Sequence, residues 1–127
     1  MKSKQELTIF IKQAASGLGF EHCGISKAVY LDDDARRLEN WLHKGMHGSM
    51  QYMENHFDLR VDPAKLVPGA KSVITLLLNY YPQEKQNPLS PKISTYAYGE
   101  DYHEVIREKL KTLIATIRQE AGDVNGR

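Results

Sequence analysis

The apolar positions near the amino terminus recur at steps of three and four residues, which is the spacing of one face of a helix. Ser3 and Glu6 stand three residues apart, as in a capping box, so the helix is expected to begin at about Lys4. Gly17 and Gly19 then supply a stop signal. The apolar stripe consists of Leu7, Phe10, Ile11, Ala14, Ala15 and Leu18.

Two further segments show a helical pattern. Three carboxylates, Asp32–Asp34, stand where a helix N-terminus favours negative charge, and Gly45 follows as the stop. The stripe of this second helix is Leu38, Trp41 and Leu42. A long amphipathic helix is predicted over Tyr102–Ala121, with Ile106, Leu110, Leu113 and Ile117 on one face.

Three segments have the pattern of strands. They are Phe20–Ile25, Lys71–Tyr80 and Ile93–Tyr98, the last closed by Gly99. The near-continuous apolar run Val73–Leu78 is typical of a central strand buried on both faces. Helices alternating with short strands predict an α/β (α+β mixed) fold, a small mixed β-sheet flanked by helices.

The connecting segments differ in character. Gly45–Pro68 is interpreted as a structured loop with one short helix around Ser49–Asn55, and Pro82–Pro91 as a polar, mobile loop. The final residues 122–127 read as a turn leading onward, so we expect the chain to be part of a longer protein. Strands that belong beside Val73–Leu78 would then be missing, and we expect self-association through an exposed edge.

Composition adds mainly exclusions. The 127 residues carry 17 Lys+Arg against 16 Asp+Glu, a formal net charge of +1, so bulk charge indicates no partner. No apolar run approaches the roughly 20 residues of a membrane span, and no secretory signal is visible, so we expect a cytoplasmic protein without membrane contact. Cys23, the one cysteine, cannot form an internal disulfide or hold zinc or an iron–sulfur cluster alone.

The richest polar cluster is Tyr96–His103, at a strand-to-helix junction. Asp101 is suited to capping the next helix, which does not prevent it from contacting a ligand. Tyr98 and Tyr102 fit either packing or ligand contact. His103 suits ligand binding and titration, although a lone histidine is more often a surface or packing residue.

Arg60 stands just before a proline turn, in Arg60-Val-Asp-Pro63. Its planar guanidinium could bind a carboxylate, a phosphate or an amide oxygen, and a plain Arg–Asp pair is the equal alternative.

Other side chains point to structure rather than chemistry. The methionines Met46, Met50 and Met53 are interpreted as core filler. No phosphate-binding, serine-hydrolase or metalloprotease signature is present. The histidines His22, His43, His47 and His56 lack metal-ligand spacing, so no metal site is expected. From the residues alone, the chain is a ligand-binding α/β domain.

A resemblance covers nearly the whole chain. The ordered blocks Gly45-Met-His-Gly48, Arg60-Val-Asp-Pro63, Leu66-Val-Pro-Gly-Ala-Lys-Ser72, Asn79-Tyr-Tyr-Pro82 and Tyr96-Ala-Tyr-Gly-Glu-Asp-Tyr-His103 carry it. Together they are specific, and the sequence resembles the N-terminal domain of epoxyqueuosine reductases.

This resemblance implies a cytoplasmic oxidoreductase that uses cobalamin and iron–sulfur clusters to reduce epoxyqueuosine to queuosine in tRNA. The domain, residues 1–127, would be the first part of a cobalamin-binding domain similar to that of reductive dehalogenases. The partners implied for the parent enzyme are the tRNA substrate and a C-terminal ferredoxin-like domain with two [4Fe–4S] clusters.

The resemblance also implies cofactor-binding residues. Arg60 would contact the polar rim of the corrinoid, and Ser94 would line the same site. The remaining residues would border the pocket, with the glycine allowing close approach of the backbone. They are Tyr98, Gly99, Asp101, Tyr102 and His103. The family usually has Trp or another aromatic residue where Tyr98 stands.

No catalytic residue is expected within the chain. The family's proton-donating Asp should lie beyond Arg127, as should the cluster cysteines, and Asp123 does not have the right context. We therefore expect these residues alone to be inactive. The alternative is a non-catalytic corrinoid-binding or assembly module of the same fold. A tRNA-binding role for this piece is disfavoured because its charges balance without a basic stripe.

Overall fold

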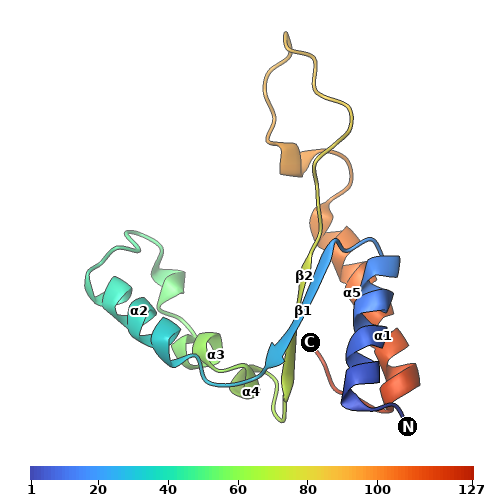
Figure 1. Cartoon of the computed structure of the whole chain (residues 1–127). Helices are drawn as coiled ribbons and strands as arrows, with labels where there is room; N and C mark the ends of the chain where they lie inside the picture. The colour runs from blue at the N-terminus through green and yellow to red at the C-terminus, as the bar shows by residue number, and fades with distance from the viewer. The chain divides into compact units, whose positions relative to one another are not determined.

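The computed structural model describes residues 1–127, which form helices and one small sheet (Figure 1). Two units emerge from the internal contacts: Met1–Gly24 with Ile74–Val124, and Ile25–Val73 with Asn125–Arg127. In chain order the elements are α1 (Lys4–Gly17), β1 (His22–Lys27), α2 (Asp32–His43), the 3₁₀ turn η1 (Gln51–Met53), α3 (Phe57–Val61), α4 (Pro63–Leu66), β2 (Ser72–Leu77), the 3₁₀ turn η2 (Thr95–Ala97) and α5 (Tyr102–Ala121).

Helix α1 begins with the predicted capping box. The Glu6 backbone N–H donates to Ser3 Oγ at 3.2 Å, and the Ser3 N–H donates to Glu6 Oε2 at 2.7 Å. The hydrogen bond from the Ser3 backbone lowers the pKa of the Glu6 carboxyl. The prediction of a helix start at Lys4 is confirmed.

The core of the first unit lies between α1 and α5, which run side by side (Figure 1). Their predicted apolar stripes supply its buried side chains apart from Phe20, which follows α1, and the start and end predicted for α5 are confirmed. The buried residues of this core are Ile11, Ala15, Phe20, Leu113 and Ile117. Removal of this apolar surface from water is the main force holding the two helices together.

The sheet has two strands, β1 and β2, rather than the predicted three. Glu21 N–H donates to Leu77 O at 2.9 Å and Ala28 N–H to Lys71 O at 3.0 Å. Residue numbers therefore rise along one strand as they fall along the other, so the pairing is antiparallel. The expectation that Val73–Leu78 is buried on both faces is wrong, because β2 has one neighbour and its residues are half-buried or exposed.

The predicted strand Ile93–Tyr98 is also wrong. This segment holds the turn η2, and neither Ile93 nor Tyr96 is buried. A strand needs backbone partners on a neighbouring strand, whereas here the Pro91 carbonyl and the Ile93 N–H are bonded to the side chain of Gln86.

The second unit contains α2, α3 and α4. The acidic first turn of α2 is confirmed, and its stripe is half-buried. The short helix expected around Ser49–Asn55 is only the turn η1, and α3 and α4 were not predicted. Asp62 explains the start of α4, because its Oδ1 accepts the Ala64 N–H at 3.0 Å.

The longest helix, α5, carries charges on several faces. No helix in the structure has both the length and the apolar character that crossing a bilayer requires.

Candidate functional site

The site predicted from the sequence centres on the junction between η2 and α5. Asp101 caps α5: its Oδ1 accepts the backbone N–H of His103 at 2.9 Å and lies 2.9 Å from the same residue's ring Nδ1. The hydrogen bond from the His103 backbone, followed by that from its ring, lowers the pKa of Asp101. The capping interpretation is therefore confirmed, and the carboxylate remains exposed.

Three aromatic rings stand beside this cap. Tyr102 stacks on the His103 ring, with centroids 4.0 Å apart and planes at 27°. Tyr96 meets Tyr102 edge to face at 6.1 Å and 82°. Tyr96 is 53% exposed and Tyr102 40%, so these rings present their surfaces outward. An exposed aromatic cluster of this kind suits a flat, partly apolar ligand.

The rings line a shallow open hollow of about 520 Å³. Gly99 lies in its wall with φ +73°, a conformation that L side chains rarely adopt, and a Cβ at this position would meet nothing within 4 Å. The backbone is therefore open to close approach by a ligand. The lining residues are Tyr96, Ala97, Gly99, Glu100, Asp101, Tyr102 and His103.

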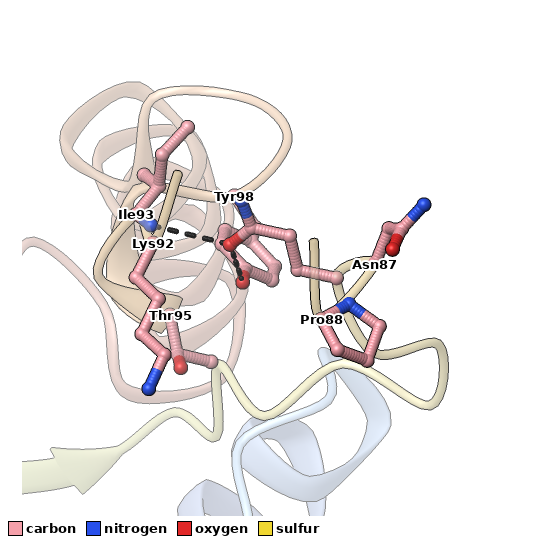
Figure 2. A pocket seen from close by; sticks show the side chains of 7 residues that line it. Asn87, Pro88, Lys92, Ile93, Thr95 and Tyr98 are labelled. Carbon is pink, nitrogen blue, oxygen red and sulfur yellow. Dashed lines mark hydrogen bonds between the residues drawn. The ribbon is translucent and has the colours of Figure 1, made fainter. Parts of the chain in front are cut away.

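Tyr98 faces a second, smaller hollow of about 270 Å³ (Figure 2). Its hydroxyl donates to Gln86 Oε1 at 2.8 Å, and the same oxygen accepts the Ile93 N–H at 3.2 Å. The lining residues are Gln86, Asn87, Pro88, Lys92, Ile93, Thr95 and Tyr98. The loop before η2 is thus tied to the residue that follows η2.

Neither Ser94 nor Arg60 lines either of these two hollows. Ser94 precedes η2, is exposed, and its side chain makes no capping hydrogen bond. Arg60 belongs to the second unit, where its Nε donates to Asn55 O at 3.0 Å and a terminal nitrogen donates to Tyr52 O at 3.1 Å. The proposed Arg–Asp pair is absent, because the guanidinium binds two backbone carbonyls instead.

His47 is a buried polar residue in the second unit. Its Nε2 lies 2.8 Å from Glu54 Oε1, its ring is 5.7 Å from that of Trp41, and its Nδ1 has no partner. The neighbouring methionines Met46 and Met50 are 62% and 40% exposed, so the predicted role of core filler is wrong for these two, whereas Met53 is half-buried. They sit around a 3₁₀ turn that has no buried face of its own.

Two residues of the site were not singled out from the sequence. Tyr96 could have been found, since it belongs to the same aromatic block as Tyr98 and Tyr102. Gln86 gave no signal, because a glutamine in a polar loop is ordinary and its partners lie five to twelve residues away.

Comparisons with known sequences agree on one family. A family profile described as "Epoxyqueuosine reductase QueG, DUF1730" matches residues 60–127, a range that includes every candidate site residue. An epoxyqueuosine reductase of Cyclobacterium marinum is 53% identical over the whole chain, and one of Cellulophaga algicola is 57% identical. The chain spans 42% of the length of each of these relatives.

Solved structures agree as well. A crystal structure of a selenomethionine-labelled epoxyqueuosine reductase matches with a TM-score of 0.83 and 27% identity, covering 95% of this chain and 33% of the other. A second epoxyqueuosine reductase, crystallised with an epoxyqueuosine-modified tRNA-Tyr stem loop, matches with a TM-score of 0.80 and 27% identity over 91% of this chain and 32% of that one.

Proposed function

The chain belongs to the epoxyqueuosine reductase family, and from this premise we propose that it is the corrinoid-binding N-terminal part of an enzyme that reduces epoxyqueuosine in tRNA. The observation that supports the proposal most directly is the exposed cluster of Tyr96, Tyr102 and His103 beside the open backbone of Gly99. The match to a reductase bound to a modified tRNA stem loop supports the substrate class.

The donor set of this junction fits a corrinoid. Cobalamin is a flat macrocycle with amide groups around its rim, and it supplies the reducing chemistry when bound. Tyr102 and His103 offer ring surfaces to a flat ligand. The exposed Asp101 carboxylate would accept hydrogen bonds from amide N–H groups, and Gly99 would let the backbone approach closely.

The family resemblance, rather than the junction geometry, assigns Arg60 to the cofactor, and its guanidinium would donate to amide oxygens. Two of the five N–H groups of a guanidinium are engaged by backbone carbonyls, so others remain for a ligand. Those two bonds also hold the guanidinium in a fixed position. Ser94, exposed just before η2, would offer a hydroxyl.

The remaining parts of the activity are assigned to the rest of the longer protein. We propose that the proton donor and the [4Fe–4S] clusters lie in segments outside these 127 residues, since the relatives are more than twice as long. The isolated chain is then inactive, and the complete enzyme acts in the cytoplasm. Turnover of epoxyqueuosine-containing tRNA by the purified chain with a reductant would contradict this assignment.

The central test is titration of the purified chain with cob(II)alamin, followed by visible and electron paramagnetic resonance spectra. Saturable binding with an altered cobalt spectrum is expected. Arg60→Ala should weaken it by roughly tenfold, the scale of one hydrogen bond to a charged group, and His103→Ala by up to about tenfold, the scale of one aromatic contact. Arg36→Ala is the matched control, because Arg36 is an exposed arginine of the same unit as Arg60, paired with Asp33. Absence of binding by the unsubstituted chain would overturn the proposal.

The two-stranded sheet supports a second, separate expectation. Both β1 and β2 have an open edge, and Leu77 on β2 is 56% exposed. An unpaired edge with apolar side chains is a template for another strand. We propose that the isolated chain self-associates, so its apparent mass in sedimentation should rise with concentration. Leu77→Lys should shift it toward the monomer, whereas concentration-independent monomers would contradict the idea.

A further inference from the structure

The side chain of Gln86 holds three groups of the loop before α5. Its Oε1 accepts the Ile93 N–H at 3.2 Å and the Tyr98 hydroxyl at 2.8 Å, and its Nε2 donates to the Pro91 carbonyl. Figure 2 shows the bonds that reach Ile93 and Tyr98. Other bonds within the loop are local, such as Ser90 N–H to Asn87 O. Gln86 is therefore the side chain that closes the loop.

The two backbone partners determine which way the amide faces. A backbone N–H can only donate, so the Gln86 atom facing Ile93 must be the oxygen. A carbonyl can only accept, so the atom facing Pro91 must be the nitrogen. The two partners therefore distinguish the amide oxygen from the amide nitrogen of Gln86, which have nearly the same shape.

This orientation fixes the role of the Tyr98 hydroxyl. Because the Gln86 oxygen has no proton to give, the hydroxyl must donate its own proton to it. The Tyr98 oxygen can then only accept a further hydrogen bond. A ligand group that meets this oxygen must therefore be a hydrogen-bond donor.

We propose that Gln86 is a positioning residue that makes Tyr98 a fixed acceptor, selective for a ligand N–H such as that of a primary amide. The proposal rests on the proposed function: it takes the ligand to be the amide-rimmed corrinoid of the junction hollow, one of whose rim amides would extend to the second hollow, which Tyr98 lines. An aromatic residue without a hydroxyl would give the same ring surface without this polarity. The pair Gln86 and Tyr98 is thus a specificity feature of this chain.

The first test is affinity for cob(II)alamin, measured from the visible spectrum. Tyr98→Phe and Gln86→Met should each weaken binding by roughly two- to tenfold, the range of one neutral hydrogen bond. The double variant should be no weaker than the worse single variant, because both changes remove one interaction. Gln83→Met, an exposed glutamine of the same loop, is the matched control. Binding by Tyr98→Phe equal to that of the unsubstituted chain, or losses that multiply, would overturn the proposal.

The donor requirement has its own probe. Cobalamin monocarboxylic acids, in which one rim propionamide has become a carboxylate, lack one N–H donor. At least one of these acids should bind the unsubstituted chain more weakly than cobalamin does. Tyr98→Phe should not weaken the binding of that acid any further. If Tyr98→Phe weakens the binding of cobalamin and of every acid by the same factor, the proposed selectivity is overturned.

A second measurement needs no cofactor and separates the two proposals. Lys85 and Lys92 place tryptic sites in the loop that Gln86 closes. Gln86→Met should speed cleavage at both, while Tyr98→Phe, which keeps the bonds to Ile93 and Pro91, should affect it far less. If the unsubstituted chain fails to bind cobalamin, the proposed function fails, and unchanged cleavage in Gln86→Met overturns the positioning role on its own.

Discussion

One oxygen of Asp101, Oδ1, lies 2.9 Å from both the backbone nitrogen and the ring Nδ1 of His103. The same carboxylate therefore caps α5 and orients the imidazole at the candidate site. The capping role of Asp101 was expected from the sequence, whereas its contact with the His103 ring was not. Because the two hydrogen bonds share one oxygen, the start of the helix and the site are coupled.

The coupling predicts a pH dependence of stability. Hydrogen bonds from His103 lower the folded-state pKa of Asp101, so the ionised cap contributes stability that is fully present above the unfolded-state value near 3.8. This contribution is lost as the pH falls through the lower folded-state pKa. Asp101→Asn keeps an acceptor but does not titrate, so its stability should fall less steeply at acid pH.

Urea unfolding followed by circular dichroism from pH 7 to pH 2 measures this difference. Asp123→Asn, an exposed carboxyl beyond α5, is the control and should follow the unsubstituted chain. Parallel curves for Asp101→Asn and the unsubstituted chain would contradict the role of the cap.

The packing of α1 against α5 makes a second prediction. Leu113 is 3% exposed in this core, so Leu113→Ala removes buried apolar surface and leaves a cavity, at a cost of about 2–5 kcal/mol in the free energy of unfolding. Leu110 lies on the same helix but is 43% exposed, and Leu110→Ala should cost much less. Chemical denaturation of both variants gives the comparison, and equal losses would show that α5 is not buried on the face described.

Gly19 supports a prediction about the end of α1. Its φ of +91° disfavours any side chain, and an added Cβ would stand 3.4 Å from Lys109 Nζ, which donates to the Leu18 carbonyl. Gly19→Ala should therefore destabilise the fold by about 1–2 kcal/mol. Gly17→Ala, within α1 and with free space around it, should instead stabilise it by about 0.4–1 kcal/mol. Thermal unfolding distinguishes the two, and changes of the same sign would contradict the argument.

The sequence predicted what depends on near neighbours. The capping box of Ser3 and Glu6, the Asp101 cap and the stripe of α5 all follow from residues within a few positions of one another. The failures involve partners that are distant or missing. Ile93–Tyr98 has the alternation of a strand, yet no strand pairs with it.

The candidate site divides in the same way. The junction of Asp101, Tyr102 and His103 is contiguous in sequence, so its residues are necessarily close in space. The Gln86 bond to Tyr98 spans a loop of no regular pattern, and only the folded chain reveals it. The roles assigned to Arg60 and Ser94 in cofactor binding stay predictions, since a family resemblance and not their local contacts suggested them.

His47 and Glu54 carry the last prediction, which concerns a buried polar pair in the second unit. The His47 side chain is only 7% exposed, and Glu54 Oε1 at 2.8 Å is the single partner of its ring. Glu54→Ala would leave both ring nitrogens unpaired, at a cost of about 1–3 kcal/mol. Glu54→Gln keeps an acceptor and should recover most of this loss.

The control is a double-variant cycle with His47→Phe. Phenylalanine keeps an aromatic ring beside Trp41 and removes both nitrogens, so Glu54→Ala should cost almost nothing in that background. Denaturation of the four proteins gives the coupling free energy directly. An equal cost of Glu54→Ala in both backgrounds would mean that Glu54 acts through its exposed surface rather than through the His47 ring.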